Sequence, residues 1–308
     1  MIKDTWFLLV NPSAGGGKAQ NHIHEIEMLL IARNMAFKID VTACPGDATN
    51  IVEKAILDGY RKFIVAGGDG TLNEVANGIL TQKVVSSTQI TLAQLPLGTG
   101  NDWRRTYGIP DNLADCIDII KGGKTNIQDA GLIRYSKDGQ IHKKYFINVA
   151  GCGFDAHVTA DANRKKLRGK SGMLTYIGSL ISSISTYKEP KVSVEIDGKK
   201  NELDLFTLLA GICKYAGNKM KLVPHAIPND GLLQTIMVRK ISRLKIIFNI
   251  ARLFNGSFTK LVEVESGSCK KIKVESNSPL LLQVDGESIG VAPFEIEILP
   301  SCLCVIVA

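Results

Sequence analysis

Three glycines surround the carboxylate of Asp69 in the stretch Gly67 to Glu74, which reads Gly-Gly-Asp-Gly-Thr-Leu-Asn-Glu. Glycines let the backbone approach a ligand closely, and the first amides of a following helix attract a phosphate group. The carboxylate of Asp69 would repel that phosphate unless a divalent cation lay between them. The stretch therefore indicates a nucleotide with a metal ion, although a tight turn without a ligand explains the same residues equally well.

Two further glycine-containing segments follow apolar runs. Asn11-Pro12-Ser13-Ala14-Gly15 comes after residues 6–10, and Gly98-Thr99-Gly100-Asn101-Asp102 comes after residues 90–95. Thr99 offers a hydroxyl and Asp102 a second carboxylate, and the next residues, Trp103 to Arg105, form a basic aromatic flank. A flexible loop or a helix cap explains each segment locally. We favour a shared role in metal and phosphate binding, because Asp102 is expected close to Asp69.

Elements that alternate between strand and helix must position these loops. Apolar runs predict strands, and amphipathic stripes between them predict helices. Such alternation is typical of a doubly wound, mostly parallel sheet, whose ligands lie beyond the carboxyl ends of the strands. All three loops fall on that edge, as does Thr42 at the end of its strand. The predicted strands are residues 6–10, 37–42, 63–66, 90–95 and 125–132, and the predicted helices are residues 19–33, 48–57, 72–80 and 112–121.

The second half of the chain is dominated by short strands, with a hairpin signal at Asp197-Gly198. Strands at this spacing predict an antiparallel β-sandwich. We place the domain boundary near residue 130, which gives an α/β domain over residues 1–130 and a sandwich domain over residues 131–308. The predicted strands are residues 144–149, 192–196, 205–212, 232–238, 261–264, 271–274, 280–284, 294–299 and 303–307.

Two predicted helical segments interrupt the sandwich, residues 159–187 and residues 242–255. The first begins with basic residues from Arg164 to Lys170 and becomes apolar from Met173 to Ile181, and the second carries an apolar face among basic residues. Basic residues beside an apolar helix face suit an anionic membrane surface. A core helix with a solvated basic rim is the alternative for either segment.

Composition limits the class of protein. The chain has 308 residues, 45% of them hydrophobic and 22% charged, with a formal net charge of +7. This composition predicts a folded globular protein with anionic partners. No aromatic stacking platform accompanies the basic segments, so nucleic acid is not an expected partner. The seven cysteines have no metal-binding spacing, and neither a basic leader nor an apolar span is evident, so we expect a cytoplasmic protein.

The octet from Gly67 to Glu74, together with the other two loops in the same order, resembles the diacylglycerol kinase catalytic domain. That domain is shared with sphingosine kinases and, more distantly, with NAD kinases. The resemblance covers nearly the whole chain. With it, the chain looks like one of the soluble bacterial lipid kinases. It implies an NAD kinase-like first domain and the transfer of a phosphoryl group from ATP, with Mg²⁺, to the free hydroxyl of a diacylglycerol-like lipid.

The resemblance also implies roles for individual residues. Glu287, in the turn Asp285-Gly286-Glu287, would be the general base, and Asp69, Asp102 and Asp129 would hold a catalytic Mg²⁺ directly or through water. Asp230, with the backbone carbonyls of Ile227 and Leu232, would bind a second Mg²⁺. The implied nucleotide contacts are Asn11, Pro12, Ser13, Ala14, Gly15, Thr42, Gly68, Asp69, Gly70, Thr71, Leu72, Asn73, Glu74 and Thr99. Without the resemblance, the segments around Asp230 and Glu287 are ordinary turns.

Two alternatives remain at this stage. An NAD kinase-type enzyme shares the central octet but lacks the Asn11-Pro12 opening and the late Asp-Gly-Glu turn. A non-catalytic nucleotide-binding or membrane-binding protein on the same scaffold would not need a general base. The lipid kinase hypothesis predicts a lipid substrate that enters between the two domains, with its acyl chains near residues 173–181. It also predicts peripheral contact with the anionic inner membrane surface, while the lipid acceptor and the presence of a homodimer stay open.

Overall fold

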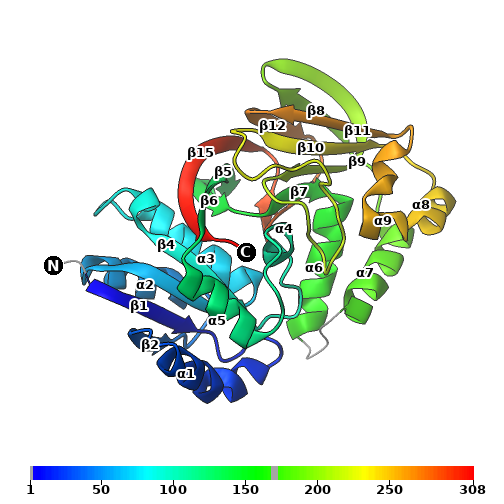
Figure 1. Ribbon diagram of the computed structural model, residues 1–308. Coiled ribbons are helices and arrows are strands. Elements are labelled where there is room, and N and C mark those ends of the chain that lie inside the picture. The colour runs from blue at the N-terminus through cyan, green and yellow to red at the C-terminus, as the bar shows by residue number, and fades with distance from the viewer. Residues whose placement is uncertain (1–2, 168–172) are drawn as a thin grey trace. The chain divides into compact units, whose positions relative to one another are not determined.

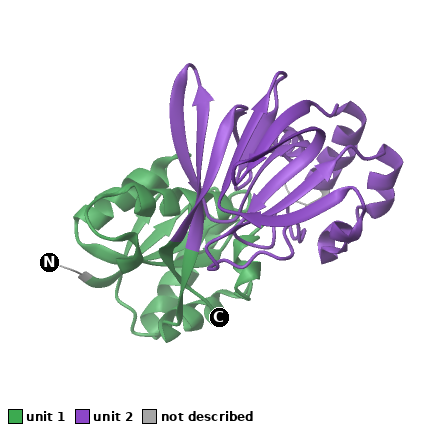
Figure 2. Cartoon of the chain, turned by 90° about the horizontal axis from the view of Figure 1, so that it is seen from above, with its two compact units in different colours: residues 1–128, 301–308 green, residues 129–300 purple. Residues whose placement is uncertain are grey.

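The computed structural model describes residues 3–167 and 173–308 (Figure 1). Arg168 and Lys170 of the predicted basic segment lie outside these residues, and so do the side chains of Met173 and Leu174. The chain divides into two compact units, residues 1–128 with 301–308 (unit 1) and residues 129–300 (unit 2), shown in Figure 2. Residues 301–308 thus group with the first half of the chain, because β15 continues into the sheet of unit 1.

Unit 1 is built on a parallel sheet with the strand order β2-β1-β3-β4. The end of β15 adds a further parallel strand beside β4, where Cys304 pairs with Thr91. Leu8, Ile64 and Leu92 are completely buried, as expected for strands covered on both faces. The predicted doubly wound α/β fold is therefore confirmed. The strands are β1 (Lys3–Val10), β2 (Phe37–Val41), β3 (Tyr60–Gly67), β4 (Thr91–Pro96) and β15 (Phe294–Ile306).

The helices of unit 1 follow the strands at their carboxyl ends. Helix α1 packs against α5, and α2 packs against α3. Helix α5 begins where the side chain of Asn112 accepts a hydrogen bond from the Asp115 amide (3.1 Å) and ends at Gly123, which has a positive φ of 69°. The helices are η1 (Lys18–His22), α1 (Ile23–Ala32), α2 (Asp47–Leu57), α3 (Asp69–Thr81), η2 (Ser87–Gln89), α4 (Trp103–Thr106) and α5 (Leu113–Gly122).

Unit 2 contains two antiparallel sheets that share the long strand β9. Residues 199–204 of β9 pair with β8, and residues 205–211 pair with β7 and β10. The predicted antiparallel second half is confirmed, although the predicted strand 144–149 is divided into two strands that leave Ile147 and Asn148 between them. The strands are β5 (Thr125–Lys137), β6 (Gln140–Phe146), β7 (Val149–Gly153), β8 (Lys191–Ile196), β9 (Lys199–Gly211), β10 (Leu233–Arg239), β11 (Val264–Cys269), β12 (Lys271–Ser276), β13 (Leu281–Val284) and β14 (Glu287–Val291).

The helices of unit 2 cover one of these sheets. Their apolar residues form a buried cluster with β7, β9 and β10. The predicted helix 242–255 is broken at residues 250–251, and the predicted strand 261–264 begins only at Val264, after a short 3₁₀ helix. In the part of the chain that the structure describes, no helix is long and apolar enough to cross a membrane. The helices are α6 (Phe154–Leu167), α7 (Met173–Thr186), α8 (Arg243–Asn249), α9 (Arg252–Asn255) and η3 (Ser257–Lys260).

Candidate active site

The three glycine-containing loops meet at the carboxyl edge of the sheet in unit 1. The Asn11 side chain donates a hydrogen bond to the Thr71 hydroxyl (2.8 Å), which joins the loop after β1 to the first turn of α3. The Leu97 amide donates to the Gly67 carbonyl (3.1 Å), which joins the loop after β4 to the end of β3. Loops far apart in the sequence therefore line one small region.

Close backbone contact explains why glycine stands at the meeting points. A Cβ atom added to Gly98 would lie 2.3 Å from the Cα of Gly68, and one added to Gly15 would lie 2.6 Å from the Leu97 carbonyl oxygen. Real Cβ atoms essentially never approach heavy atoms this closely. Gly15 also has a φ of +63°, a left-handed conformation that favours glycine.

Asn101 holds the Gly98 turn, a role that the sequence did not reveal. Its side-chain oxygen accepts from the Gly98 amide (3.0 Å), and its side-chain nitrogen donates to the carbonyls of Pro96 (2.9 Å) and Gly98 (2.8 Å). Asn101 is buried and has a φ of +50°. Asparagine tolerates this conformation better than most side chains, which is the one sequence signal that could have indicated this role.

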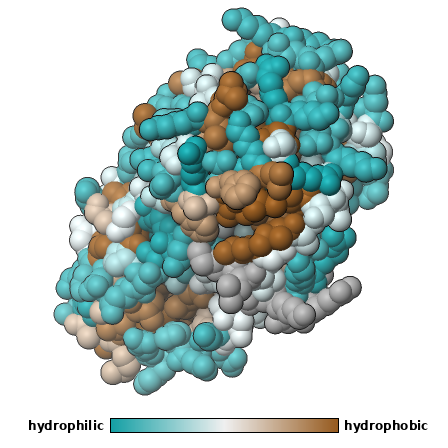
Figure 3. Space-filling model, turned by 90° about the vertical axis from the view of Figure 1, so that its right-hand side faces the viewer, coloured by the Kyte–Doolittle hydropathy of each residue, from teal (hydrophilic) through white to brown (hydrophobic). Residues whose placement is uncertain are grey.

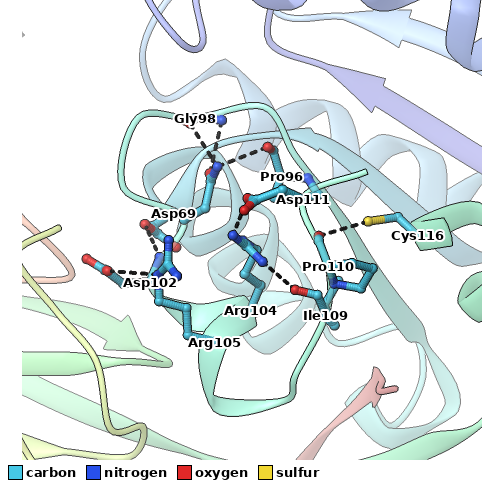
Figure 4. A network of polar contacts seen from close by, with 11 residues as sticks. Asp69, Pro96, Gly98, Asp102, Arg104, Arg105, Ile109, Pro110, Asp111 and Cys116 are labelled. Carbon is cyan, nitrogen blue, oxygen red and sulfur yellow. Dashed lines mark hydrogen bonds and ion pairs between the residues drawn. The ribbon is translucent and has the colours of Figure 1, made fainter. Parts of the chain in front are cut away.

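Asp69 and Asp102 lie next to each other at this edge (Figure 4). The Asp69 carboxylate accepts hydrogen bonds from the amides of Asp102 (2.9 Å) and Trp103 (3.1 Å). The Asp102 side chain is buried, and its carboxylate lies 3.8 Å from Nε of Arg105. Burial raises the pKa of Asp69 above its usual range, against the opposing effects of the two amides and of the Arg105 guanidinium. Negative charge at this position is therefore only partly compensated.

The carboxylate oxygens of Asp69 and Asp102 fit a magnesium ion as ligands. Carboxylate oxygens are the ligands that this hard cation prefers, and a cation would offset the cost of burying the Asp69 charge. Within residues 3–167 and 173–308, however, no three side chains of His, Cys, Asp or Glu converge as a metal-binding group. Phosphate oxygens and water would have to complete the coordination, as is usual for magnesium in kinases.

Asp129, the third predicted carboxylate, belongs to unit 2. Its carboxylate accepts a hydrogen bond from the Gly231 amide (2.7 Å), and its own amide donates to the Pro228 carbonyl (2.7 Å). Asp129 therefore fixes the turn that carries Asp230. Asp230 is exposed and accepts from the Leu232 amide (3.0 Å). Its oxygen atoms and the carbonyls of the turn have the chemistry of a hard-cation site, and the predicted second magnesium there stays a prediction.

The prediction that Trp103 to Arg105 form a basic flank is wrong for Arg104. The Arg104 guanidinium is buried and donates to the Ile109 carbonyl and to the Asp111 carboxylate, so it is directed into unit 1 (Figure 4). The indole nitrogen of Trp103 donates to the side chain of Gln128 (2.9 Å). These two residues anchor α4, and only Arg105 faces the Asp69 and Asp102 pair.

The remaining predicted nucleotide contacts differ in the surroundings of their side chains. Glu74 accepts from the amides of Gly46 (3.0 Å) and Ala48 (3.3 Å) and so holds the start of α2. Leu72 is completely buried, which leaves only its backbone for a ligand. Thr42 is buried and Thr99 is exposed. The contribution of each to nucleotide binding stays a prediction.

In unit 2, Glu287 follows a tight turn whose other residues are firmly held. The Asp285 carboxylate accepts hydrogen bonds from the amides of Ile147 (2.9 Å), Asn148 (3.1 Å) and Val149 (2.9 Å). Gly286 has a φ of +83°, and the half-exposed Glu287 carboxylate forms an ion pair with Lys144. Lys144 was not identified from the sequence, since nothing in its own neighbourhood marks it.

A cavity of about 110 Å³ lies under the helices of unit 2. Its lining is almost entirely apolar and comes from α6, α7, β9, β10, α8, α9, η3 and β11 and the segments between them. Asp155, Thr207 and Asn249 are among its polar residues. Burial raises the pKa of Asp155 to about 6, although its carboxylate accepts a hydrogen bond from the side chain of Gln283 (2.7 Å). The predicted acyl-chain region overlaps this lining at Tyr176 and Leu180.

Family models cover nearly the whole chain. Residues 5–133 match the family model of the diacylglycerol kinase catalytic domain, and residues 148–307 match that of the YegS C-terminal NAD kinase beta sandwich-like domain. The chain belongs to the diacylglycerol kinase family. With that family it is a phosphotransferase that uses an alcohol group as acceptor, as the sequence predicted.

Relatives match along nearly their whole length. The diacylglycerol kinase of Mycobacterium tuberculosis (strain ATCC 25618 / H37Rv) is 31% identical over 304 residues, which cover 97% of this chain and 93% of the relative. That of Bacillus subtilis (strain 168) is 29% identical over 288 residues, or 94% and 91%. A diacylglycerol kinase structure from Bacillus anthracis str. Sterne superposes with a TM-score of 0.74 at 24% identity, covering 99% and 97%. Yeast NADH kinase shares the fold alone, with a TM-score of 0.57 at 11% identity over 99% of this chain and 84% of that one.

Proposed function

We propose that this protein phosphorylates the free hydroxyl of diacylglycerol or a similar lipid, using ATP and magnesium. The observation that carries the proposal is the convergence of three glycine-containing loops beside Asp69 and Asp102 in unit 1. Backbone amides at this edge suit a polyphosphate, and two adjacent carboxylates suit the cation that accompanies it. Family membership supports the lipid acceptor over NAD.

The residues of unit 1 would position the nucleotide. The backbone of Asn11 to Gly15 and the amides of Gly68 to Thr71 would hold the phosphate groups. Asp69 and Asp102 would hold magnesium, which when bound neutralises charge on the phosphates. Arg105 would limit the repulsion between the two carboxylates when magnesium is not bound. Most of the catalytic effect in phosphoryl transfer comes from such positioning and charge compensation.

Glu287 would act as the general base. In the proposed step, the acceptor hydroxyl gives its proton to the Glu287 carboxylate while its oxygen bonds to the γ-phosphorus of ATP. The bond from that phosphorus to the bridging oxygen breaks, and ADP leaves. The ion pair with Lys144 and the hydrogen bonds that hold the Asp285-Gly286 turn limit the orientations of the carboxylate. A restricted base is what proton transfer at hydrogen-bond distance needs.

The cavity of unit 2 would receive hydrocarbon from the lipid acceptor. Its apolar lining excludes water more readily than acyl chains, so occupation by a lipid would be favourable. A substrate of this kind is held in bilayers, and the protein would therefore work at an anionic membrane surface on the cytoplasmic side. These assignments follow from the lipid kinase proposal.

The test is direct phosphorylation by purified protein. Labelled ATP, magnesium, dispersed diacylglycerol and NAD are supplied side by side, and a total lipid extract is used to identify other acceptors. We expect label in phosphatidic acid and none in NADP. Glu287→Gln should lose roughly 10²–10⁴-fold in labelling rate with unchanged ATP binding. Labelling of NAD alone would refute the lipid acceptor, and full activity of Glu287→Gln would remove Glu287 from the mechanism.

A further inference from the structure

Helix α8 has apolar residues on two of its faces. Ile246, in the middle of the helix, and Ile250, just beyond its end, line the cavity of unit 2. On the other side, Leu244, Ile247 and Phe248 have exposed fractions of 68%, 48% and 82%. These three residues, which we call the α8 outer face, stand at helical positions i, i+3 and i+4 and so form one stripe. The cavity helix thus also presents large hydrophobic side chains to the outside.

Further apolar residues are exposed on the same side of unit 2 as α8. Figure 3 views the side on which α7 and α8 lie, and hydrophobic residues gather in the middle of that side. Helix α7 packs against α8 and adds Ile181, which is 52% exposed. Single exposed apolar residues are ordinary, whereas contiguous ones mark an interaction surface or a membrane contact.

The charge around the outer face indicates the partner. Residues 239–262 contain Arg239, Lys240, Arg243, Lys245, Arg252 and Lys260 and no acidic residue. Arg239 pairs with Glu265 (2.7 Å) and Lys245 pairs with Glu263 (2.6 Å). Lys240, Arg243, Arg252 and Lys260 are exposed. An apolar stripe in a segment with several exposed cations complements a surface that is hydrocarbon inside and anionic outside.

We infer that the α8 outer face inserts into an anionic phospholipid bilayer and that lipid passes along α8 into the cavity behind it. The inference rests on the proposed function only for the fate of the lipid, because docking itself requires no catalysis. Leu244, Ile247 and Phe248 enter the boundary between headgroups and acyl chains, and the four exposed cations contact the headgroups. One helix then serves both as the membrane contact and as a wall of the acyl-chain cavity.

Vesicle sedimentation with the full chain tests the docking. The probes are vesicles of phosphatidylcholine alone and of phosphatidylcholine with phosphatidylglycerol, without ATP. We expect binding to the anionic vesicles that weakens with salt, and a loss of at least tenfold in the partition coefficient for Leu244→Glu and for Phe248→Glu. The matched control is Leu57→Glu, because Leu57 ends α2 in unit 1 and is 70% exposed. This control should bind like the unchanged protein.

Several results would overturn the inference. The first is absence of binding to anionic vesicles, the second is equal loss in Leu57→Glu, and the third is unchanged binding in both α8 variants. If Leu244→Glu instead converts a dimer into a monomer and leaves vesicle binding intact, the surface joins two copies of the chain and the inference is wrong. Activity on a short-chain, water-soluble diacylglycerol separates the two proposals. Leu244→Glu should retain activity on this soluble substrate. If neither the unchanged protein nor any variant phosphorylates it, the result counts against the kinase proposal and not against the membrane contact.

Discussion

Replacing Gly98 by alanine tests whether the glycine loops must touch. The new Cβ would lie 2.3 Å from the Cα of Gly68 and 2.7 Å from the side-chain oxygen of Asn101. Since carbon atoms in contact lie about 3.5–4.0 Å apart, the two loops must separate by about 1 Å. Overpacking of this kind costs about 1–3 kcal/mol of stability. A 1 Å displacement of phosphate-binding backbone lowers kcat/KM about 100-fold.

The control for this prediction is Gly122→Ala in the same unit. Gly122 is the last residue of α5, and a Cβ there meets no atom within 4 Å, so alanine should stabilise the helix by roughly 0.5–1 kcal/mol. Urea denaturation, ATP titration and lipid phosphorylation are measured for both variants. The two substitutions should move the free energy of unfolding in opposite directions. Normal stability and normal kcat/KM in Gly98→Ala would refute the requirement for close loop contact.

Two further predictions concern carboxylates. The pKa of Asp155 is raised to about 6 in the folded protein, so its contribution to stability is complete below the ordinary value of 3.8 and is lost as the pH rises through 6. Asp155→Asn should therefore lose less stability between pH 4.5 and pH 7 in urea denaturation, and equal losses would contradict the assignment. Glu74→Ala should lower the free energy of unfolding by about 1–2 kcal/mol, because two amides at the start of α2 lose their acceptor, with ATP affinity changed less than twofold. A tenfold loss of ATP affinity at unchanged stability would instead favour the predicted nucleotide contact.

The parallel half of the fold could be predicted because its signals are local. Buried strands read as continuous apolar runs, and a glycine-rich turn follows the strand at Ala66 and the strand at Leu95. The carboxyl ends of parallel strands share one edge, so the meeting of the loops followed from topology. The sequence could not show that Gly68 and Gly98 touch, because that depends on backbone geometry across two strands.

Tertiary contacts decided the features that the sequence misjudged. Apolar spacing predicts one helix over residues 242–255, yet the chain turns at residues 250–251, where Ile250 reaches the cavity. Arg104 was predicted to belong to a basic aromatic flank, but Asp111 and the Ile109 carbonyl bind its guanidinium inside unit 1. In both places, packing partners that are not evident from local sequence overrode a local pattern.

The clearest limit of sequence reasoning is the link between the cavity and the Glu287 turn. Gln283 donates to Asp155, 128 positions away in the chain, and its side-chain oxygen accepts from the Gly286 amide (3.0 Å). A polar residue of the cavity lining is therefore joined through one side chain to the backbone beside Glu287. Two hydrogen bonds of the Gln283 side chain, one to Asp155 and one from the Gly286 amide, make this link. The Asp285-Gly286-Glu287 turn carries a family motif that can be recognised in the sequence. Asp155 carries no such motif, and it comes close to Gln283 only when β7 and β13 pair in the folded unit.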